Sequence, residues 1–333
     1  MNLSLGLIIV GLAGVLQGTF FLPMTYTRKW EWAHKWFAFS LLAMLLVNWC
    51  IAFFTIGHII TIISAIPSTL LLTVLFFGFC WGVGAVFFGK AMDLLGMALG
   101  YPIIMGINAM AGTIIPALLF SPEIFIRYKG IMIITGALIS TSGIVLCAKA
   151  SAGKNKGTLQ SKYSRTGLIL AVISGFTSCL PNIGAAFSKD ITAIALGVGV
   201  NSVLAGNVVW SLFFTMGAIV NAGYCLYLMF RNKDVSELNN NYRLLNWGLI
   251  LVMSVMWIGS FYAYGIGSAI LGDLGLIVGW PLLVSLSIVI GNLWGLFRRE
   301  WAGAPKSSRN LLTRGIYILI LSILIIASGN FFS

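Results

Sequence analysis

Long apolar stretches separated by short polar loops recur along the whole chain of 333 residues. A helix needs about 20 apolar residues to cross the hydrocarbon core of a bilayer, and stretches of that length predict ten transmembrane helices. We expect them at residues 3–22, 37–56, 69–89, 98–120, 128–148, 167–187, 198–221, 245–268, 274–297 and 312–331. The predicted fold class is therefore an all-α membrane protein with ten transmembrane helices.

One pattern of Trp, Gly and Pro occurs twice within these stretches. It reads W-x7-G-x6-G-x3-G-Y-P from Trp81 to Pro102, and W-x7-G-x6-G-x6-G-W-P from Trp257 to Pro281. Matched Gly and Pro interruptions in two halves of an apolar chain are typical of the binding site of a secondary transporter. The repeat therefore indicates two related halves that share one site.

A polar stretch at residues 149–165 divides the predicted helices into two groups of five. We interpret it as a cytoplasmic linker between a first half, 1–148, and a second half, 166–333, of one integrated membrane domain. Because each half has an odd number of spans, the second half enters the membrane from the opposite face. We therefore expect a 5+5 inverted repeat.

Charged residues are few and unevenly placed. They make up 8% of the chain, with a net charge of +12. If the N-terminus lies outside, all 20 Lys and Arg residues fall on the cytoplasmic side except Arg127, Lys129 and Lys189. Such asymmetry sets the orientation of membrane proteins. We expect both termini outside, and basic loops that contact anionic lipid head groups rather than nucleic acid.

Polar and aromatic residues repeat at helical spacing within several predicted spans. Polar side chains are costly in a membrane unless they face protein or water, so these stripes indicate a cavity of amides, hydroxyls and aromatic rings for a neutral polyhydroxylated solute. The alternative is hydrogen bonding between helices, with aromatic residues at the membrane interface. The candidate substrate-binding residues are Gln17, Trp81, Tyr101, Asn108, Ser178, Asn182, Trp257, Tyr264 and Trp280. On the ninth span the stripe also includes Ser287, Gly291 and Trp294.

No acidic residue lies at the middle of a predicted span, where a proton carrier often has a desolvated carboxylate. The nearest candidates for proton coupling are Asp93 and Asp273, and Glu31 and His34 in the first cytoplasmic loop are additional ones. The five cysteines and two histidines have no spacing typical of a metal site. We therefore expect no metal, no cofactor and no enzymatic activity.

Four segments resemble the L-rhamnose–proton symporter family of the drug/metabolite transporter superfamily. They are LPMTYTRKWEWAHKW at 22–36, LLGMALGYPIIMGINAMAGTIIP at 94–116, GAIVNAGYC at 217–225 and GNLWGLFRREWAGA at 291–304. The resemblance implies a carrier of the bacterial inner membrane that imports a sugar, L-rhamnose or a related one, with a proton by alternating access. Ala33 departs from the family pattern K-W-x-W-E-x-x-W, which has an acid there.

The partners that follow are the sugar, the coupling proton and membrane lipids, with the carrier as a monomer or a homodimer. A drug or metabolite exporter of the same superfamily is the alternative function, since an aromatic-rich cavity suits both.

Overall fold

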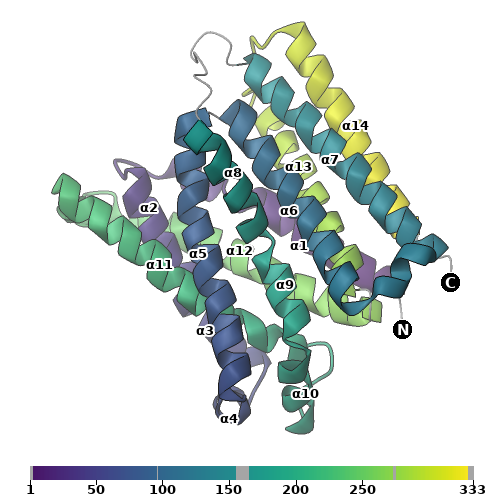
Figure 1. Ribbon diagram of the computed structural model, residues 1–333. Helices are drawn as coiled ribbons and strands as arrows, with labels where there is room; N and C mark the ends of the chain where they lie inside the picture. The colour runs from purple at the N-terminus through teal and green to yellow at the C-terminus, as the bar shows by residue number, and fades with distance from the viewer. Residues whose placement is uncertain (1–2, 96, 155–164, 273–274, 329–333) are drawn as a thin grey trace.

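The computed structural model describes residues 3–95, 97–154, 165–272 and 275–328, and these are helical apart from short connections. Ten helical stretches in them are long and apolar enough to cross a membrane (Figure 1). They are Leu3–Tyr26, Trp32–Thr55, Ser68–Met92, Ile103–Phe120, Gly130–Lys154, Arg165–Phe187, Ala205–Asn232, Arg243–Leu271, Gly275–Phe297 and Lys306–Ser328. The prediction of an all-α membrane protein with ten spans is confirmed.

Several spans consist of more than one helical element. The elements of the first half are α1 (Leu3–Thr19), η1 (Pro23–Tyr26), α2 (Trp32–Phe39), η2 (Ser40–Val47), α3 (Asn48–Thr55), α4 (Ile59–Ala65), α5 (Ser68–Leu95), α6 (Met97–Phe120), η3 (Pro122–Ile126) and α7 (Tyr128–Lys154). Those of the second half are α8 (Arg165–Ser178), α9 (Leu180–Phe187), α10 (Lys189–Gly197), η4 (Ala205–Asn207), α11 (Val208–Asn232), η5 (Val235–Asn239), α12 (Arg243–Leu271), α13 (Gly275–Phe297) and α14 (Lys306–Ser328). Residues 149–154 of the predicted linker continue α7.

The seventh span differs most from its predicted bounds of 198–221. Gly199 has a positive φ of 89°, and the Asn201 side chain accepts a hydrogen bond from the backbone N–H of Val203, so this apolar stretch begins as a turn. At the other end, α11 continues past Asn221, which is buried and donates to the carbonyl oxygen of Gly217. The prediction was wrong here because hydropathy alone does not distinguish a buried polar residue from the start of a loop.

The two halves interlock. The first helix of the first half, α1, packs along α12 and α13, and the first helix of the second half, α8, packs along α5 and α6. The last helices of the halves, α7 and α14, lie side by side along their length (Figure 1). Each half therefore buries its first helix against the third and fourth spans of the other.

Close helix packing in this interlocked arrangement depends on glycine. A Cβ added at Gly18 on α1 would lie 2.6 Å from the Cβ of Ile290 on α13, and one at Gly82 on α5 would lie 2.9 Å from the Cβ of Val220 on α11. Small residues let two backbones approach closely in lipid, where van der Waals packing drives helix association.

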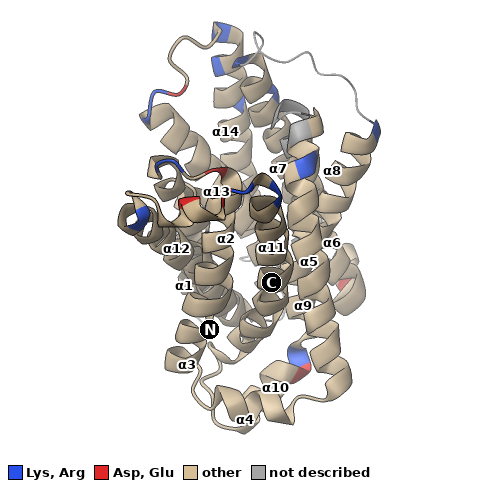
Figure 2. Ribbon diagram, turned by 90° about the vertical axis from the view of Figure 1, so that its left-hand side faces the viewer, with Lys and Arg blue, Asp and Glu red and all other residues tan. Residues whose placement is uncertain are grey.

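Basic residues gather towards one end of the helical bundle. Figure 2 shows most of the Lys and Arg positions in its upper half, whereas Lys189 lies near α10 at the lower end. We call the end of the bundle where most Lys and Arg residues lie the basic end. The positive-inside rule places the basic end in the cytoplasm, and this orientation is still a prediction.

Candidate cavity and its lining

A cavity of about 720 Å³ lies between the helices of the two halves. This volume falls in the range of roughly 300–1,000 Å³ that is usual for small-molecule sites. Of the described residues that line it, the charged ones are Arg298 and Glu300, just after α13. Their side chains are 29% and 48% exposed, so the cavity reaches solvent at the basic end.

The inner part of the cavity contains a stacked pair of indoles. Trp81 on α5 and Trp257 on α12 have ring centroids 5.9 Å apart and planes inclined by 28°. Phe214 and Phe261 pack against Trp257 with centroids 4.8 and 5.0 Å away. Trp81 and Trp257 are the first residues of the two copies of the repeat, so the repeated pattern meets itself at this cavity.

Gly217 on α11 leaves the space that Trp81 occupies. A Cβ at this position would lie 2.6 Å from the Trp81 ring, which is closer than van der Waals contact permits. Offset aromatic pairs contribute about 0.5–1.5 kcal/mol beyond their buried area. The stacked indoles are therefore held by contact with neighbouring aromatic rings and by the space that Gly217 leaves for Trp81. Together they form an apolar wall of the cavity.

Amide groups provide part of the polar lining, beside the hydroxyl groups of Thr25, Ser151, Ser178 and Ser287. Asn108 on α6 is 6% exposed, and its Oδ1 is buried without a hydrogen-bond partner. Gln17 on α1 accepts a hydrogen bond from the Ser260 hydroxyl at 2.5 Å. The Nδ2 of Asn292 on α13 donates to the backbone oxygen of Ile288. Asn108 thus lines the cavity with a side chain whose buried oxygen is an unused acceptor. The wall around it is rich in aromatic rings.

Most of the candidate substrate-binding residues come together here. Gln17, Trp81, Asn108, Ser178, Trp257 and Trp280 line the cavity, as do Ser287, Gly291 and Trp294 from the stripe on the ninth span. Tyr101 lies in α6, but its side chain is outside the described part of the structure. The lining also includes Trp36, Phe261 and Asn292, which the sequence analysis did not single out.

Asn182 and Tyr264 do not line the cavity. Asn182 donates from Nδ2 to the backbone oxygens of Gly112 and Leu276, at 2.7 and 3.1 Å. The Tyr264 hydroxyl donates to the Asn182 side-chain oxygen, and its ring packs edge-on against Trp280. These contacts match the alternative explanation of their stripes, which was hydrogen bonding between helices. A role in substrate binding stays a prediction for both.

Asn182 and Tyr264 form a buried layer beside Trp280, which lines the cavity. Tyr264 lies about two turns beyond Trp257 along α12, away from the basic end. Asn182 and Tyr264 are both fully buried. The cavity is therefore open at the basic end, and a buried hydrogen-bonded layer lies beyond Trp257 in the other direction.

Among the three acidic candidates for proton coupling, only Glu31 has a described side chain, and it does not line the cavity. Glu31 is an exposed residue just before α2, and its side chain forms no capping hydrogen bond. Asp93 is near the end of α5, and its side chain is not among those described; Asp273 lies outside the described residues. Within the described part of the chain, no group of three or more His, Cys, Asp or Glu residues has the arrangement of a metal site.

Comparison with known proteins connects this architecture with a transport family. The family model for the L-rhamnose-proton symport protein (RhaT) matches residues 1–331. L-rhamnose-proton symporters of Escherichia coli O1:K1, Escherichia coli O157:H7 and Shigella dysenteriae serotype 1 are each 25% identical over 320 residues, which is 93% of this chain and 93% of theirs. The similarity therefore includes both halves.

Proposed function

Since the chain belongs to the L-rhamnose-proton symport protein family, we propose that it imports a small neutral sugar, L-rhamnose or a close relative, together with a proton. The protein is a multi-pass transporter of the bacterial inner membrane and not an enzyme. One observation carries the proposed sugar site. Asn108, whose buried side-chain oxygen has no hydrogen-bond partner, lines one cavity together with the stacked Trp81 and Trp257.

The chemistry of the lining supports a sugar as substrate. Indole faces pack against the C–H surfaces of a pyranose, and amides both donate to and accept from hydroxyls. A buried acceptor without a partner costs about 1–3 kcal/mol, and a sugar hydroxyl that donates to the Asn108 oxygen removes that cost. Arg298 and Glu300 lie at the mouth of the cavity, so its inner part suits a neutral solute.

Alternating access supports import through this site. The first helices of the two halves have exchanged packing partners, as an inverted repeat of interlocked halves predicts. With the basic end in the cytoplasm, the cavity of the present conformation opens inward. If each half adopts the conformation that the other half has now, the cavity opens outward instead. The relatives named above are symporters, so importing a sugar with a proton is favoured over the export of a drug or metabolite.

Sugar uptake by reconstituted protein tests this function. Proteoliposomes that are acidic outside are expected to accumulate radiolabelled L-rhamnose, and a protonophore is expected to abolish the accumulation. Asn108→Ala is expected to weaken binding about tenfold, the loss of roughly one good hydrogen bond. Asn232→Ala, at the exposed end of α11, is the control and keeps full uptake. The proposal fails if neither L-rhamnose nor any related monosaccharide responds to the pH gradient.

A further inference from the structure

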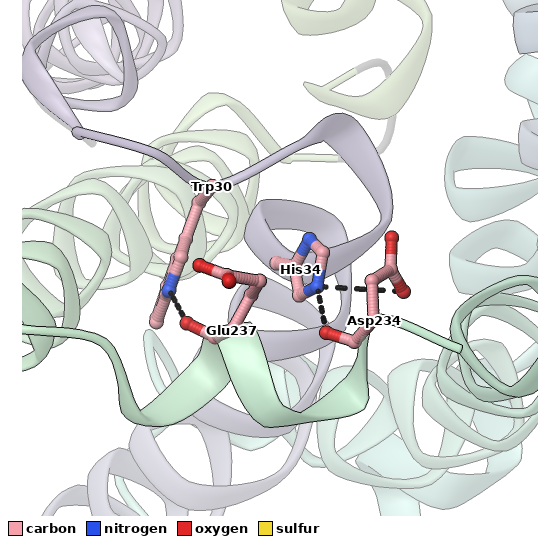
Figure 3. Close-up of polar contacts among 4 residues, drawn as sticks. All are labelled: Trp30, His34, Asp234 and Glu237. Atoms are coloured by element: carbon pink, nitrogen blue, oxygen red, sulfur yellow. Dashed lines mark hydrogen bonds and ion pairs between the residues drawn. The ribbon is translucent and has the colours of Figure 1, made fainter. Parts of the chain in front are cut away.

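His34 is a fully buried histidine in the first turn of α2, and it faces the turn before η5 (Figure 3). Its Nε2 lies 2.9 Å from the backbone oxygen of Asp234 and 3.7 Å from the Asp234 carboxylate. Because a carbonyl oxygen can only accept, Nε2 carries a hydrogen. In the neutral ring Nδ1 is then an acceptor, and this atom is buried without a hydrogen-bond partner.

This pair is the most shielded acid–histidine pair among the side chains that the structure describes. The described carboxylates of Glu31, Glu123, Asp190, Glu237 and Glu300 are exposed, and so is the second histidine, His58. The Asp234 side chain is 24% exposed and His34 is 0% exposed. Asp234 thus links a buried titratable ring to the water at the basic end.

The pair also joins the two halves of the protein. Trp30 donates from Nε1 to the backbone oxygen of Glu237 at 2.9 Å (Figure 3). Asn246 bonds both the backbone N–H and the backbone oxygen of Arg28, each at 2.9 Å. We call this junction, residues 28–34 with residues 234–246, the clasp. It fastens the loop before α2 to the second half.

The clasp is directly connected to the wall of the cavity. Trp36 lies two residues after His34 on α2 and lines the cavity. Its Nε1 donates to the Asn221 side chain on α11 at 2.9 Å. A shift in the first turn of α2 would therefore move a residue that lines the cavity.

We propose that His34, paired with Asp234, holds the coupling proton, an inference that rests on the proposed sugar–proton import. A proton from water binds to Nδ1 of the neutral ring, and the Asp234 carboxylate balances the new positive charge. Release breaks the same N–H bond and returns the proton to water. Since the protonated ring and the carboxylate attract each other, proton binding tightens the clasp and proton loss loosens it.

The charged groups around the pair favour release at the basic end. The elements that pack here carry three carboxylates, including that of Asp234, and several cations. The other two acids are Glu31 and Glu237, and the cations are Arg28, Lys29, Lys35, Arg231, Lys233 and Arg243. Arg28 and Lys29 lie over the Tyr242 ring, 5.3 and 6.0 Å from its centroid. The excess of positive charge opposes retention of a proton on His34 when the clasp opens.

Removing the titratable groups separates coupling from transport. His34→Gln and Asp234→Asn are expected to lower pH-driven accumulation of L-rhamnose in proteoliposomes to the equilibrium ratio of about one. Exchange of labelled for unlabelled sugar at equal pH is expected to continue, with its pH dependence flattened. Asp234→Asn keeps the backbone oxygen that His34 contacts, so it supplies the test if His34→Gln does not fold.

Two controls separate proton binding from mere packing. Trp30→Phe removes the hydrogen bond to Glu237 from the same clasp but no titratable group, and His58→Gln removes an exposed histidine; both are expected to accumulate sugar. The inference is wrong if the His34 and Asp234 variants accumulate sugar with a normal pH profile. It is also wrong if Trp30→Phe uncouples transport as strongly as His34→Gln and Asp234→Asn do. The same holds if Asp93→Asn uncouples transport while the His34 and Asp234 variants do not. Failure of the unmodified protein to accumulate sugar would instead count against the proposed function.

Discussion

The two ends of the helical bundle join the same parts of the two halves by different chemistry. At the basic end, the loop between the first two spans of the first half meets the loop between the second and third spans of the second half. At the opposite end α10, between the first two spans of the second half, meets α4, between the second and third spans of the first. The two junctions therefore have the same topology, except that the first and second halves exchange their roles between the two ends.

Their contacts have almost nothing in common. The clasp depends on hydrogen bonds from Trp30, His34 and Asn246, whereas α4 and α10 bury Ile62 and Ile191. Hydrogen bonds need defined distances and angles, while apolar burial is non-directional and tolerates sliding. The difference suggests that the clasp specifies one conformation, while the α4–α10 junction supplies stability that depends less on geometry.

The largest expected effect is at the apolar junction. Ile62→Ala removes a side chain that is 0% exposed, and such a truncation costs about 2–5 kcal/mol. Thermal unfolding of the purified protein in detergent measures the loss. Ile60→Ala is the matched control, because Ile60 is 71% exposed. Equal unfolding temperatures for the two variants would contradict the view that α4 is held by apolar burial.

A smaller effect is expected at the clasp. Asn246→Ala leaves the backbone N–H and oxygen of Arg28 without their partner, at a cost of about 1–3 kcal/mol. Because Asn246 has no titratable group, the loss is expected to be the same at pH 6 and pH 8. Asn232→Ala, at the exposed end of α11 and outside the clasp, supplies the comparison. A loss that disappeared at one pH would show that the Asn246 hydrogen bonds form only in one protonation state of the clasp.

The smallest effect is expected for the ion pair at the cavity mouth. The Nη1 of Arg298 lies 3.6 Å from the Glu300 carboxylate, and both side chains are partly exposed. Solvent screening limits such pairs to about 0–1 kcal/mol, so Glu300→Gln is expected to leave stability nearly unchanged. Thermal unfolding of the Glu300→Gln variant at low and high salt checks this. A large loss of stability that appears only at low salt would contradict the prediction and would mean that this ion pair helps to hold the basic end together.

Local pattern explains what could be predicted from the sequence. Span number follows from the length of apolar stretches, and the stripe from Trp280 to Trp294 lines the cavity because its spacing is fixed within a single helix. The same kind of stripe did not place Asn182 or Tyr264 at the cavity. A polar face on a helix is equally satisfied by the carbonyl oxygens of a neighbouring helix, as at Gly112.

The clasp shows what local pattern cannot reveal. His34 and Asp234 are 200 positions apart. His34 occupies only an unspecified position of the K-W-x-W-E-x-x-W pattern, and neither residue belongs to a helical stripe. Only the packing of α2 against the second half brings them together. The sequence suggested both Glu31 and His34 in this loop but could not rank them, and in the structure Glu31 is exposed whereas His34 is buried.

The stacked indoles have a consequence for the energetics of the transport cycle. Trp81 and Trp257 occupy the same position in the two copies of the repeat. If the halves exchange shapes, each indole takes over the surroundings of the other, and the sugar meets the same aromatic wall from either face of the membrane. A site of this kind has no intrinsic preference for loading over unloading, so a concentration ratio above one must come entirely from the proton.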